Sequence, residues 1–247
     1  MIIRAPVPVF PLSVVIPALD EAVALPGTLA SLERQGSDPP FEVLLADGGS
    51  RDGTVARFED LTRGWASGDR IARVVACPRS GRAEQMNAGA RAAAGEVLVF
   101  LHADTHLPSG ATRAVVQALA DPAVAGGGFR HAFLDPGVLL RIISFWATAR
   151  SLVRRIHYGD QAIFARRSVF EAIGGFPGDP LFEDLEFSRR LRARGRVVTL
   201  PLAVSTSARR LRQGGVARTA VRFAWMKLLH ALGVEPGRQK TGYPDVR

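Results

Sequence analysis

Short apolar segments alternate with helix-like segments over the first half of the chain. Four of these apolar segments predict strands, at residues 12–17, 41–50, 70–77 and 96–104. Helical patterns fill the intervening segments 21–34, 52–65 and 81–95, and Asp52 is a candidate N-cap of the second helix. Strands that are apolar throughout and are separated by helices predict a parallel sheet with helices on both faces.

The alternation loosens after about residue 125. Residues 124–133 predict a strand whose glycines permit close backbone approach, and further strands are expected at 161–167 and 196–210. Helices are expected at 138–155, 182–195 and 215–232. The sequence thus predicts an α/β fold with a doubly wound, mostly parallel, Rossmann-like sheet over residues 1–210. Residues 211–247 are expected to be an amphipathic helix and tail packed on that domain.

The expected C-terminal helix separates polar from apolar residues. At about 100° per residue, one half of its circumference carries the polar side chains Arg218, Thr219, Arg222, Lys227 and His230. The opposite side carries Val216, Ala220, Phe223, Ala224 and Leu228. Docking on the core is the expected arrangement, while a homodimer contact or a peripheral contact with an anionic membrane stays open.

Composition adds limits on location and partners. The chain has 247 residues, 47% hydrophobic and 22% charged, no apolar run long enough to span a membrane, and no signal-peptide pattern. Cys77 is the only cysteine, which excludes an internal disulfide. These features predict a cytoplasmic protein, with association at the inner face of the membrane left open. The net charge of +9 fits phosphate-bearing ligands, nucleic acid or a membrane surface, and also a GC-rich genome.

Polar side chains follow three of the predicted parallel strands. Glu21 comes after the first strand, Asp47 ends the second, and the fourth continues into His102, Asp104 and His106. Each of these residues alone is typical of a turn or helix cap. Because the carboxyl ends of parallel strands meet at one edge, where ligands bind, the group predicts a binding site. Alternation along a continued strand would point the last three side chains to the same side.

A divalent cation would allow such an acidic edge to bind phosphate. Asp104 is the expected ligand of Mg²⁺ or Mn²⁺, with His102 and His106 as further candidates and diphosphate oxygens completing the shell. Arg209 and Arg210 are candidates for clamping the diphosphate, because a guanidinium matches phosphate oxygens. No phosphate-loop or dinucleotide-binding glycine pattern is present in the sequence.

Five segments resemble, in order, the motifs of the family 2 glycosyltransferases with the GT-A fold. They are VVIPALDEA, LLADGGSRDGT, GRAEQMNAGARAAAGEVLVFLHADTHLP, GGF and FEDLEFSRRLRARG, and they extend over roughly residues 10–210. More narrowly, YGDQAIF and TSARR resemble a bacterial subgroup labelled arsenosugar-biosynthesis glycosyltransferases. The resemblance implies inverting transfer of a sugar from a nucleotide diphosphate, with UDP expected, to an acceptor hydroxyl.

The resemblance also implies residue roles. The expected nucleotide-binding residues are Pro17, Ala18, Glu21, Asp47, Arg82, Asn87 and Ala103. Asp104 would hold the metal and Asp184 would be the general base, with Glu183 beside it; Asp160 and Gln161 would contact donor sugar or acceptor. Two positions depart from the family pattern, since Asp20 replaces a common Asn and His102 replaces the first Asp of Asp-x-Asp. The acceptor is unknown, and a lipid-linked or membrane-borne one stays open.

Two alternatives belong to other functional classes. A nucleotidyltransferase could use the same metal and carboxylates, but it should carry a basic, glycine-rich loop after the first strand, where this chain has the acidic PALDEAVALPG. A nucleic-acid or membrane-surface binding module would explain the positive charge but not the acidic edge. We therefore expect no nucleic-acid partner.

Overall fold

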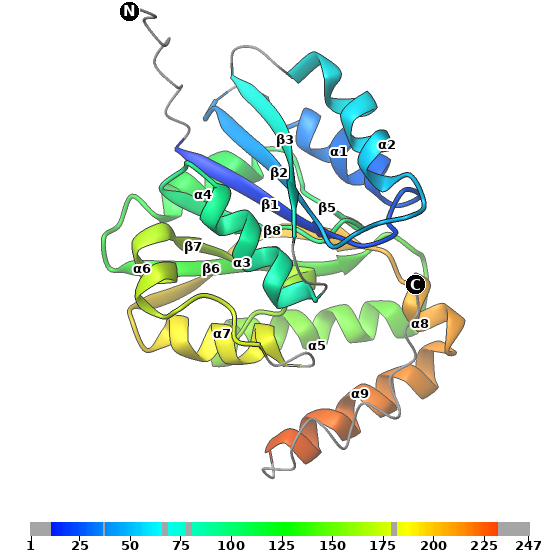
Figure 1. Cartoon of the computed structure of the whole chain (residues 1–247). Coiled ribbons are helices and arrows are strands. Elements are labelled where there is room, and N and C mark those ends of the chain that lie inside the picture. The colour runs from blue at the N-terminus through cyan, green and yellow to red at the C-terminus, as the bar shows by residue number, and fades with distance from the viewer. Residues whose placement is uncertain (1–10, 37, 66–68, 78–80, 179–181, 232–247) are drawn as a thin grey trace, which may run out of the picture.

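The structure is a computed structural model that describes residues 11–36, 38–65, 69–77, 81–178 and 182–231 (Figure 1). Its described strands form one curled sheet in the order β3-β2-β1-β4-β7-β6-β8-β5. Their bounds are β1 Leu12–Ala18, β2 Phe41–Asp47, β3 Arg70–Ala76, β4 Val97–Phe100, β5 Thr105–His106, β6 Val124–Phe133, β7 Phe164–Arg166 and β8 Arg196–Thr206.

Most strand pairs are parallel, as the sequence predicts. Strands β3, β2, β1 and β4 run parallel to their neighbours, and β6 pairs in parallel with β8. Strand β7 is antiparallel to both β4 and β6, and the two-residue β5 is antiparallel to β8. The α/β class and the mostly parallel sheet are therefore confirmed.

Helices cover both faces of the sheet. They are α1 Leu25–Glu33, α2 Thr54–Thr62, α3 Arg82–Ala92, α4 Ala111–Ala118, α5 Val138–Arg154, α6 Arg167–Ala172, α7 Glu183–Arg192, α8 Arg209–Gln213 and α9 Val216–Ala231, with 3₁₀ turns η1 at Arg63–Trp65 and η2 at Gly159–Gln161. The short helices α4, α6 and α8 were not expected from the sequence.

Alternate residues of the central strands belong to two separate cores. On β1, Val14 and Ile16 pack with the cluster formed by α1, α2 and α4, whereas Val15 packs with the cluster formed by α3, α6 and α7. The side chains of β1 and β2 are all buried. Burial on both faces explains why these strands have continuous apolar sequences rather than alternating ones.

Four phenylalanine rings hold helix α7 against the sheet. Phe187 of α7 stacks on Phe176 with 4.1 Å between ring centroids, and both rings lie within 6.1 Å of Phe100 on β4. Phe170 of α6 completes the cluster. This packing fixes the first turn of α7, which carries Glu183 and Asp184.

Close backbone approach requires the glycines of β6, as expected. A Cβ at Gly126 or Gly127 would overlap the carbonyl oxygen of Phe164 or Val198, respectively, on the neighbouring strands.

The N-cap of α2 lies one residue after Asp52, the residue expected from the sequence. Gly53 is the N-cap residue of α2, while the Asp52 carboxylate accepts a hydrogen bond from the backbone N–H of Thr54 (2.9 Å).

Helix α9 contacts α5 and α8 and packs on the domain through Phe223 and Met226. Met226 is buried against Ile156, Phe182 and Leu185. None of the described helices has both the length and the hydropathy of a membrane-spanning segment. The expected tail, residues 232–247, lies outside the described residues. The same holds for the side chains of Ala224, Lys227, Leu228 and His230. The predicted division of the chain at residue 210 into a domain and a C-terminal extension stays a prediction.

Candidate active site

A cleft with a volume of about 520 Å³ lies between the carboxyl ends of β1 and β4 and the helices α5, α7 and α9. Of the residues expected to form a site, it brings together Pro17, Glu21, Arg82, His102, Ala103, Asp104, Asp160, Asp184 and Arg210. They come from segments up to 193 residues apart in the chain, from Pro17 to Arg210, whereas Asp47 and His106, also expected at this edge, do not line the cleft.

Acidic and basic groups face each other on the β1 side of the cleft. The Glu21 carboxylate accepts a hydrogen bond from Arg209 and lies 3.7 Å from the Arg210 guanidinium. Arg209 also lies 3.7 Å from the Asp104 carboxylate. Burial raises the pKa of Glu21, and Arg209 opposes that shift. The basic residues after β8 therefore neutralise the carboxylates of this edge.

Arg82 contacts both acids at the start of α7, Glu183 and Asp184. Its guanidinium binds the Glu183 carboxylate and lies 3.4 Å from the Asp184 carboxylate. Glu183 is 1% exposed and does not line the cleft, and burial raises its pKa. Asp184 lines the cleft. In the sequence, only the motif match distinguishes Asp184 from Glu183. In the structure the two also differ in position, because Asp184 lines the cleft and Glu183 does not.

A backbone contact orients Asp184. Its Oδ2 accepts a hydrogen bond from the N–H of Gly159 (3.0 Å), while its Oδ1 has no hydrogen-bond partner among the described residues. The His102 ring packs against Gly159, where an added Cβ would lie 2.5 Å from Cε1 of the ring. Burial and the nearby Arg82 both lower the pKa of His102. His102, Gly159 and Asp184 thus form one packed unit at the cleft floor.

The expected continuation of the fourth strand through Asp104 is wrong, because β4 ends at Phe100, although His102 and Asp104 both line the cleft. Residues 101–104 leave the sheet, and Thr105–His106 pair instead with β8 as β5. The His106 ring packs against Gly27 of α1, where an added Cβ would lie 2.5 Å from Nε2, and it does not line the cleft. Within the described ranges, no three His, Cys, Asp or Glu side chains are grouped to hold a metal.

Several other candidate residues are used elsewhere in the fold. The Asp47 carboxylate accepts hydrogen bonds from Gly49 and Ser50 in its own turn. The Asn87 amide bonds twice to the backbone of Phe176, both at 2.9 Å. Neither residue lines the cleft. Their expected contacts with a nucleotide stay predictions.

Ala18 and Gln161 also lie outside the cleft lining. The carbonyl oxygen of Ala18 accepts a hydrogen bond from Gln85, and Ala18 is 1% exposed. Gln161 is fully buried and bonds to Arg150 (2.6 Å) and to the carbonyl of Phe129 (2.9 Å). Its neighbour Asp160 does face the cleft, with its carboxylate 3.5 Å from His131 Nε2.

Sequence reasoning did not identify the apolar side of the cleft. We call it the apolar wall, and it consists of Trp146, Ala147, Phe182, Leu185, Phe223 and Met226. These residues come from α5, from α7 with the residue just before it, and from α9. Helical patterning alone marks them as core residues, and no local signal distinguishes a core residue from a cleft-lining one.

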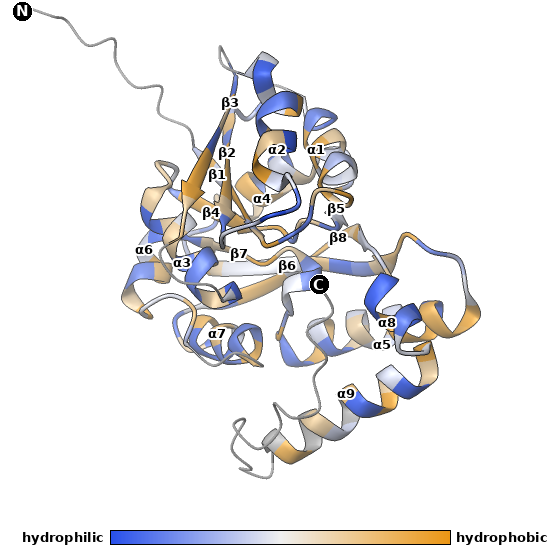
Figure 2. Ribbon diagram, turned by 45° about the vertical axis from the view of Figure 1, so that its right-hand side comes forward, coloured by the Kyte–Doolittle hydropathy of each residue, from blue (hydrophilic) through white to orange (hydrophobic). Residues whose placement is uncertain are grey.

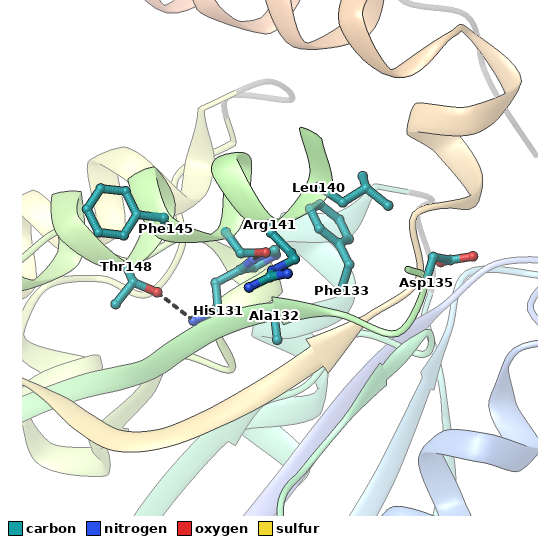
Figure 3. A pocket seen from close by; sticks show the side chains of 9 residues that line it. His131, Ala132, Phe133, Asp135, Leu140, Arg141, Phe145 and Thr148 are labelled. Carbon is teal, nitrogen blue, oxygen red and sulfur yellow. Dashed lines mark hydrogen bonds between the residues drawn. The ribbon is translucent and has the colours of Figure 1, made fainter. Parts of the chain in front are cut away.

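A second cavity of about 340 Å³ lies between β6 and α5 (Figure 3). His131 lies beneath it, where its backbone N–H donates to Thr148 Oγ1 (3.0 Å) and its ring contacts Ser144 Oγ (3.1 Å). Burial lowers the pKa of His131. His131 and Phe133 also line the main cleft, so these two side chains separate the two cavities.

Comparison with known proteins identifies the family. The model of glycosyl transferase family 2 matches residues 13–174. A PGL/p-HBAD biosynthesis glycosyltransferase of Mycobacterium bovis (strain BCG / Pasteur 1173P2) is 32% identical over 225 residues, which are 88% of this chain and 83% of that protein. A protein of the same name from Mycobacterium tuberculosis (strain ATCC 25177 / H37Ra) matches equally well.

Solved structures share the fold. The mannosyltransferase PcManGT from Pyrobaculum calidifontis, in complex with GDP-Man and Mn²⁺, has a TM-score of 0.64 at 24% identity over 80% of this chain. TarS 1–349 of S. aureus has a TM-score of 0.61 at 18% identity, also over 80% of this chain. The chain spans 57% and 60% of those two proteins.

These relatives decide between the functional classes. They favour glycosyl transfer over nucleotidyl transfer or a binding module, but they do not support the narrower arsenosugar label, because the relatives named here carry a different one. The matched family model covers more than half of the chain and includes the segments that form the acidic edge of the cleft. The chain therefore belongs to glycosyl transferase family 2 and is a glycosyltransferase.

Proposed function

We propose that this enzyme transfers a sugar, with inversion, from a nucleotide diphosphate to an acceptor hydroxyl, with Asp184 as general base. The observation that carries the proposal is the placement of Asp184 in the cleft, with one carboxylate oxygen held by Gly159 and the other without a partner in the described structure. A base needs a fixed orientation and an oxygen whose hydrogen-bonding capacity is not already used; Gly159 orients Asp184, and its buried Oδ1 has no partner among the described residues.

The reaction exchanges one bond for another. The acceptor oxygen forms a bond to the anomeric carbon as Asp184 takes the hydroxyl proton. The bond between that carbon and the diphosphate oxygen breaks, and its electron pair leaves with the nucleoside diphosphate. Attack from the side opposite the leaving group inverts the anomeric centre. Glu183 is held by Arg82 away from the cleft, which leaves Asp184 as the acid of this pair that can reach the acceptor.

Asp104 would hold a divalent cation, Mg²⁺ or Mn²⁺, together with the donor. Its carboxylate faces the cleft, and no group of three protein ligands accompanies it among the described residues. Such a site suits a cation that keeps waters and binds through one or two carboxylates plus substrate phosphates. When bound, the cation neutralises negative charge on the leaving diphosphate. His102 lines the same cleft and stays a candidate further ligand, whereas His106 does not line it.

The basic residues after β8 would respond to donor binding. Arg209 pairs with Glu21 and Asp104, and Arg210 pairs with Glu21. A diphosphate is a stronger partner for a guanidinium, because it offers several anionic oxygens in a matching geometry. We therefore assign these two arginines to the diphosphate and Pro17, Glu21, Arg82 and Ala103 to the remainder of the nucleotide, with UDP as the expected carrier.

Thermal unfolding tests the donor and metal assignments. UDP, GDP, CDP and dTDP are added singly, with and without Mn²⁺. A ligand at 100 times its Kd stabilises by about 2.7 kcal/mol, which raises Tm by roughly 5–10 °C in a chain of this size. We expect one nucleotide to give a metal-dependent shift that is lost in Asp104→Ala. No shift with any nucleotide would contradict the proposal.

Activity tests the general base. Asp184→Asn should lower kcat by at least about 10²-fold while leaving the nucleotide-induced Tm shift intact. Glu186→Gln is the matched control, because Glu186 lies on the same helix and pairs with Arg189 and Arg190 outside the cleft. Full activity in Asp184→Asn would remove the assignment.

A peripheral membrane contact is a second proposal, which rests on the outer surface of α5 and α9 (Figure 2). Exposed apolar side chains on these helices include Val138, Ile142, Phe145, Val153, Val221 and Trp225, with exposed Arg141, Arg154 and Arg218 beside them. Aromatic and basic residues together suit an anionic lipid surface. Val153→Glu should weaken cosedimentation with phosphatidylglycerol vesicles and Leu61→Glu, on α2, should not; equal binding by both variants would contradict it. The cytoplasmic location stays a prediction.

A further inference from the structure

We infer that the acceptor is an alcohol whose hydroxyl is borne by an apolar alkyl or aryl body, and that the apolar wall binds this body. The inference rests on the proposed function, because it takes Asp184 as the group that removes the acceptor proton. It adds the chemical class of the acceptor, which the family and the fold leave undetermined.

The position of the apolar wall relative to Asp184 is the first observation. Phe182 and Leu185 flank Asp184 in the sequence and line the same cleft. Both are nearly buried, at 7% and 8% exposure. The Asp184 carboxylate itself contacts the Gly159 N–H and lies 3.4 Å from Arg82. Phe182 and Leu185 add apolar surface to the same cleft, so the body of an acceptor bound there meets apolar side chains.

Helices α5 and α9 extend the apolar surface away from the base. Met226 packs with Phe182 and Leu185 in one buried cluster, and Phe223 contacts the same cluster. Trp146 of α5 lines the cleft and is also 66% exposed, so it stands at the cleft mouth. The wall thus continues from the base to solvent, as an elongated apolar body would require.

The apolar wall offers few hydrogen-bonding groups to an acceptor. A carbohydrate acceptor presents several hydroxyls, and each one buried without a partner costs free energy. The six residues of the apolar wall offer only the indole N–H of Trp146 as a side-chain donor. Arg150 and Tyr158 also line the cleft, but the Arg150 guanidinium stacks on Tyr158, 3.7 Å from the ring centroid, and bonds to Gln161. The wall therefore matches alkyl or aryl groups better than a sugar.

Several charged side chains are paired with one another on the β1 side of the cleft, while Arg150 and Asp160 line it elsewhere. Glu21, Asp104, Arg209 and Arg210 are grouped on the β1 side, where the diphosphate is assigned. Asp184 lies between the two ends, with Arg82 on one side and Phe182 and Leu185 beside it in the chain. One cavity thus holds the paired charges to which the donor is assigned, the apolar wall proposed for the acceptor, and Asp184.

A series of primary alkanols tests the inference. The thermal-shift screen selects the nucleotide, and the sugar donors that carry it are used in turn. With each donor, kcat/KM is measured for 1-propanol, 1-butanol, 1-pentanol and 1-hexanol by release of nucleoside diphosphate. Methyl glucoside serves as the polyhydroxylated comparison. Each methylene group buried on the wall should raise kcat/KM by about fourfold. The alkyl glycoside product is confirmed by mass spectrometry, which separates transfer from donor hydrolysis.

Matched variants locate the effect on the wall. Trp146→Ala and Phe223→Ser should reduce the gain per methylene to less than twofold, while the nucleotide-induced Tm shift stays unchanged. Val153→Ser on α5 and Val221→Ser on α9 replace exposed side chains outside the cleft and should keep the fourfold gain. Trp146 is largely exposed, so its replacement tests the wall even if Phe223→Ser loosens α9.

Three results would overturn the inference while leaving the proposed function intact. These are nucleotide binding with no transfer to any alkanol, a rate independent of chain length, or a preference for methyl glucoside over 1-hexanol. A protein that binds no nucleotide would instead overturn the proposed function itself. The thermal-shift measurement therefore distinguishes the two failures.

Discussion

Gly159→Ala should disable the site through a single methyl group. Gly159 packs against the His102 ring and donates its N–H to Asp184. An added Cβ would lie 2.5 Å from His102 Cε1 and 3.0 Å from Asp184 Oδ2. The ring Nε2 would be closer still, and ordinary contacts are near 3.5 Å, so the ring or the turn has to move by more than about 1 Å. The perturbation therefore reaches the proposed base directly.

The size of the effect follows from this displacement. Overpacking by one methyl group typically costs about 1–3 kcal/mol of unfolding free energy, which lowers Tm by roughly 2–12 °C in a chain of this length. A 1 Å misplacement of a catalytic group costs about 10²-fold in rate. We expect both losses in Gly159→Ala, measured by thermal unfolding and by kcat per folded molecule.

A double-mutant cycle shows whether His102 is the group displaced. In a His102→Ala background, the space of the ring is free, and Gly159→Ala should cost less than about 0.5 kcal/mol. Gly95→Ala is a control at the opposite edge of the sheet, where the Cβ would lie 2.7 Å from Ser13 Oγ. It should lower stability without changing kcat. Strictly additive costs in the cycle, or normal kcat in Gly159→Ala, would refute the reasoning.

Other predictions concern the fold around the site. Phe187→Ala should lower the unfolding free energy by about 3–5 kcal/mol in urea titrations, because the ring is fully buried and stacks on Phe176; a loss below 1 kcal/mol would contradict the packing. Burial lowers the pKa of His157 to about 3, so the unfolded chain binds a proton that the folded chain excludes. Stability should therefore fall as pH drops below about 6.5, by about 2 kcal/mol between pH 8 and pH 5, and His157→Gln should lack this part of the loss. Burial raises the pKa of Cys77 to about 11, so its reaction with a thiol reagent at pH 8 should be about 10²-fold slower than in the urea-unfolded chain; equal rates would show an accessible thiolate.

The strands in the first half of the chain were predictable because burial on both faces leaves a continuous apolar run in their own sequence. Val14, Val15 and Ile16 are all apolar since each face of β1 has its own helical layer, and this pattern is visible without knowing the partners. The metal-site alternation failed for the opposite reason. Strand β5 exists because Thr105 pairs with Thr206, 101 residues away, and no local pattern shows where β4 stops.

The site was partly predictable for a similar reason. Glu21, Asp104 and Asp184 follow strand ends or begin a helix, so topology alone brings them to one edge. Asp47 is also at a strand end, but its carboxylate is satisfied within its own turn, a local competition that strand order does not reveal. Phe223 and Trp146 required the tertiary packing of α9 and α5, which helical periodicity does not specify.

The position of β7 has a consequence for synthesis of the chain on the ribosome. This three-residue strand lies between β4 and β6 in the middle of the sheet. Until it is made, the apolar strand β4, with the sequence VLVF, is an unprotected edge of a half-sheet formed by the first four parallel strands. Residues 164–166 follow β4 by about 60 positions, which takes several seconds at typical translation rates. Such an edge invites pairing with other chains. Aggregation during expression should therefore depend on how fast residues 101–166 are translated.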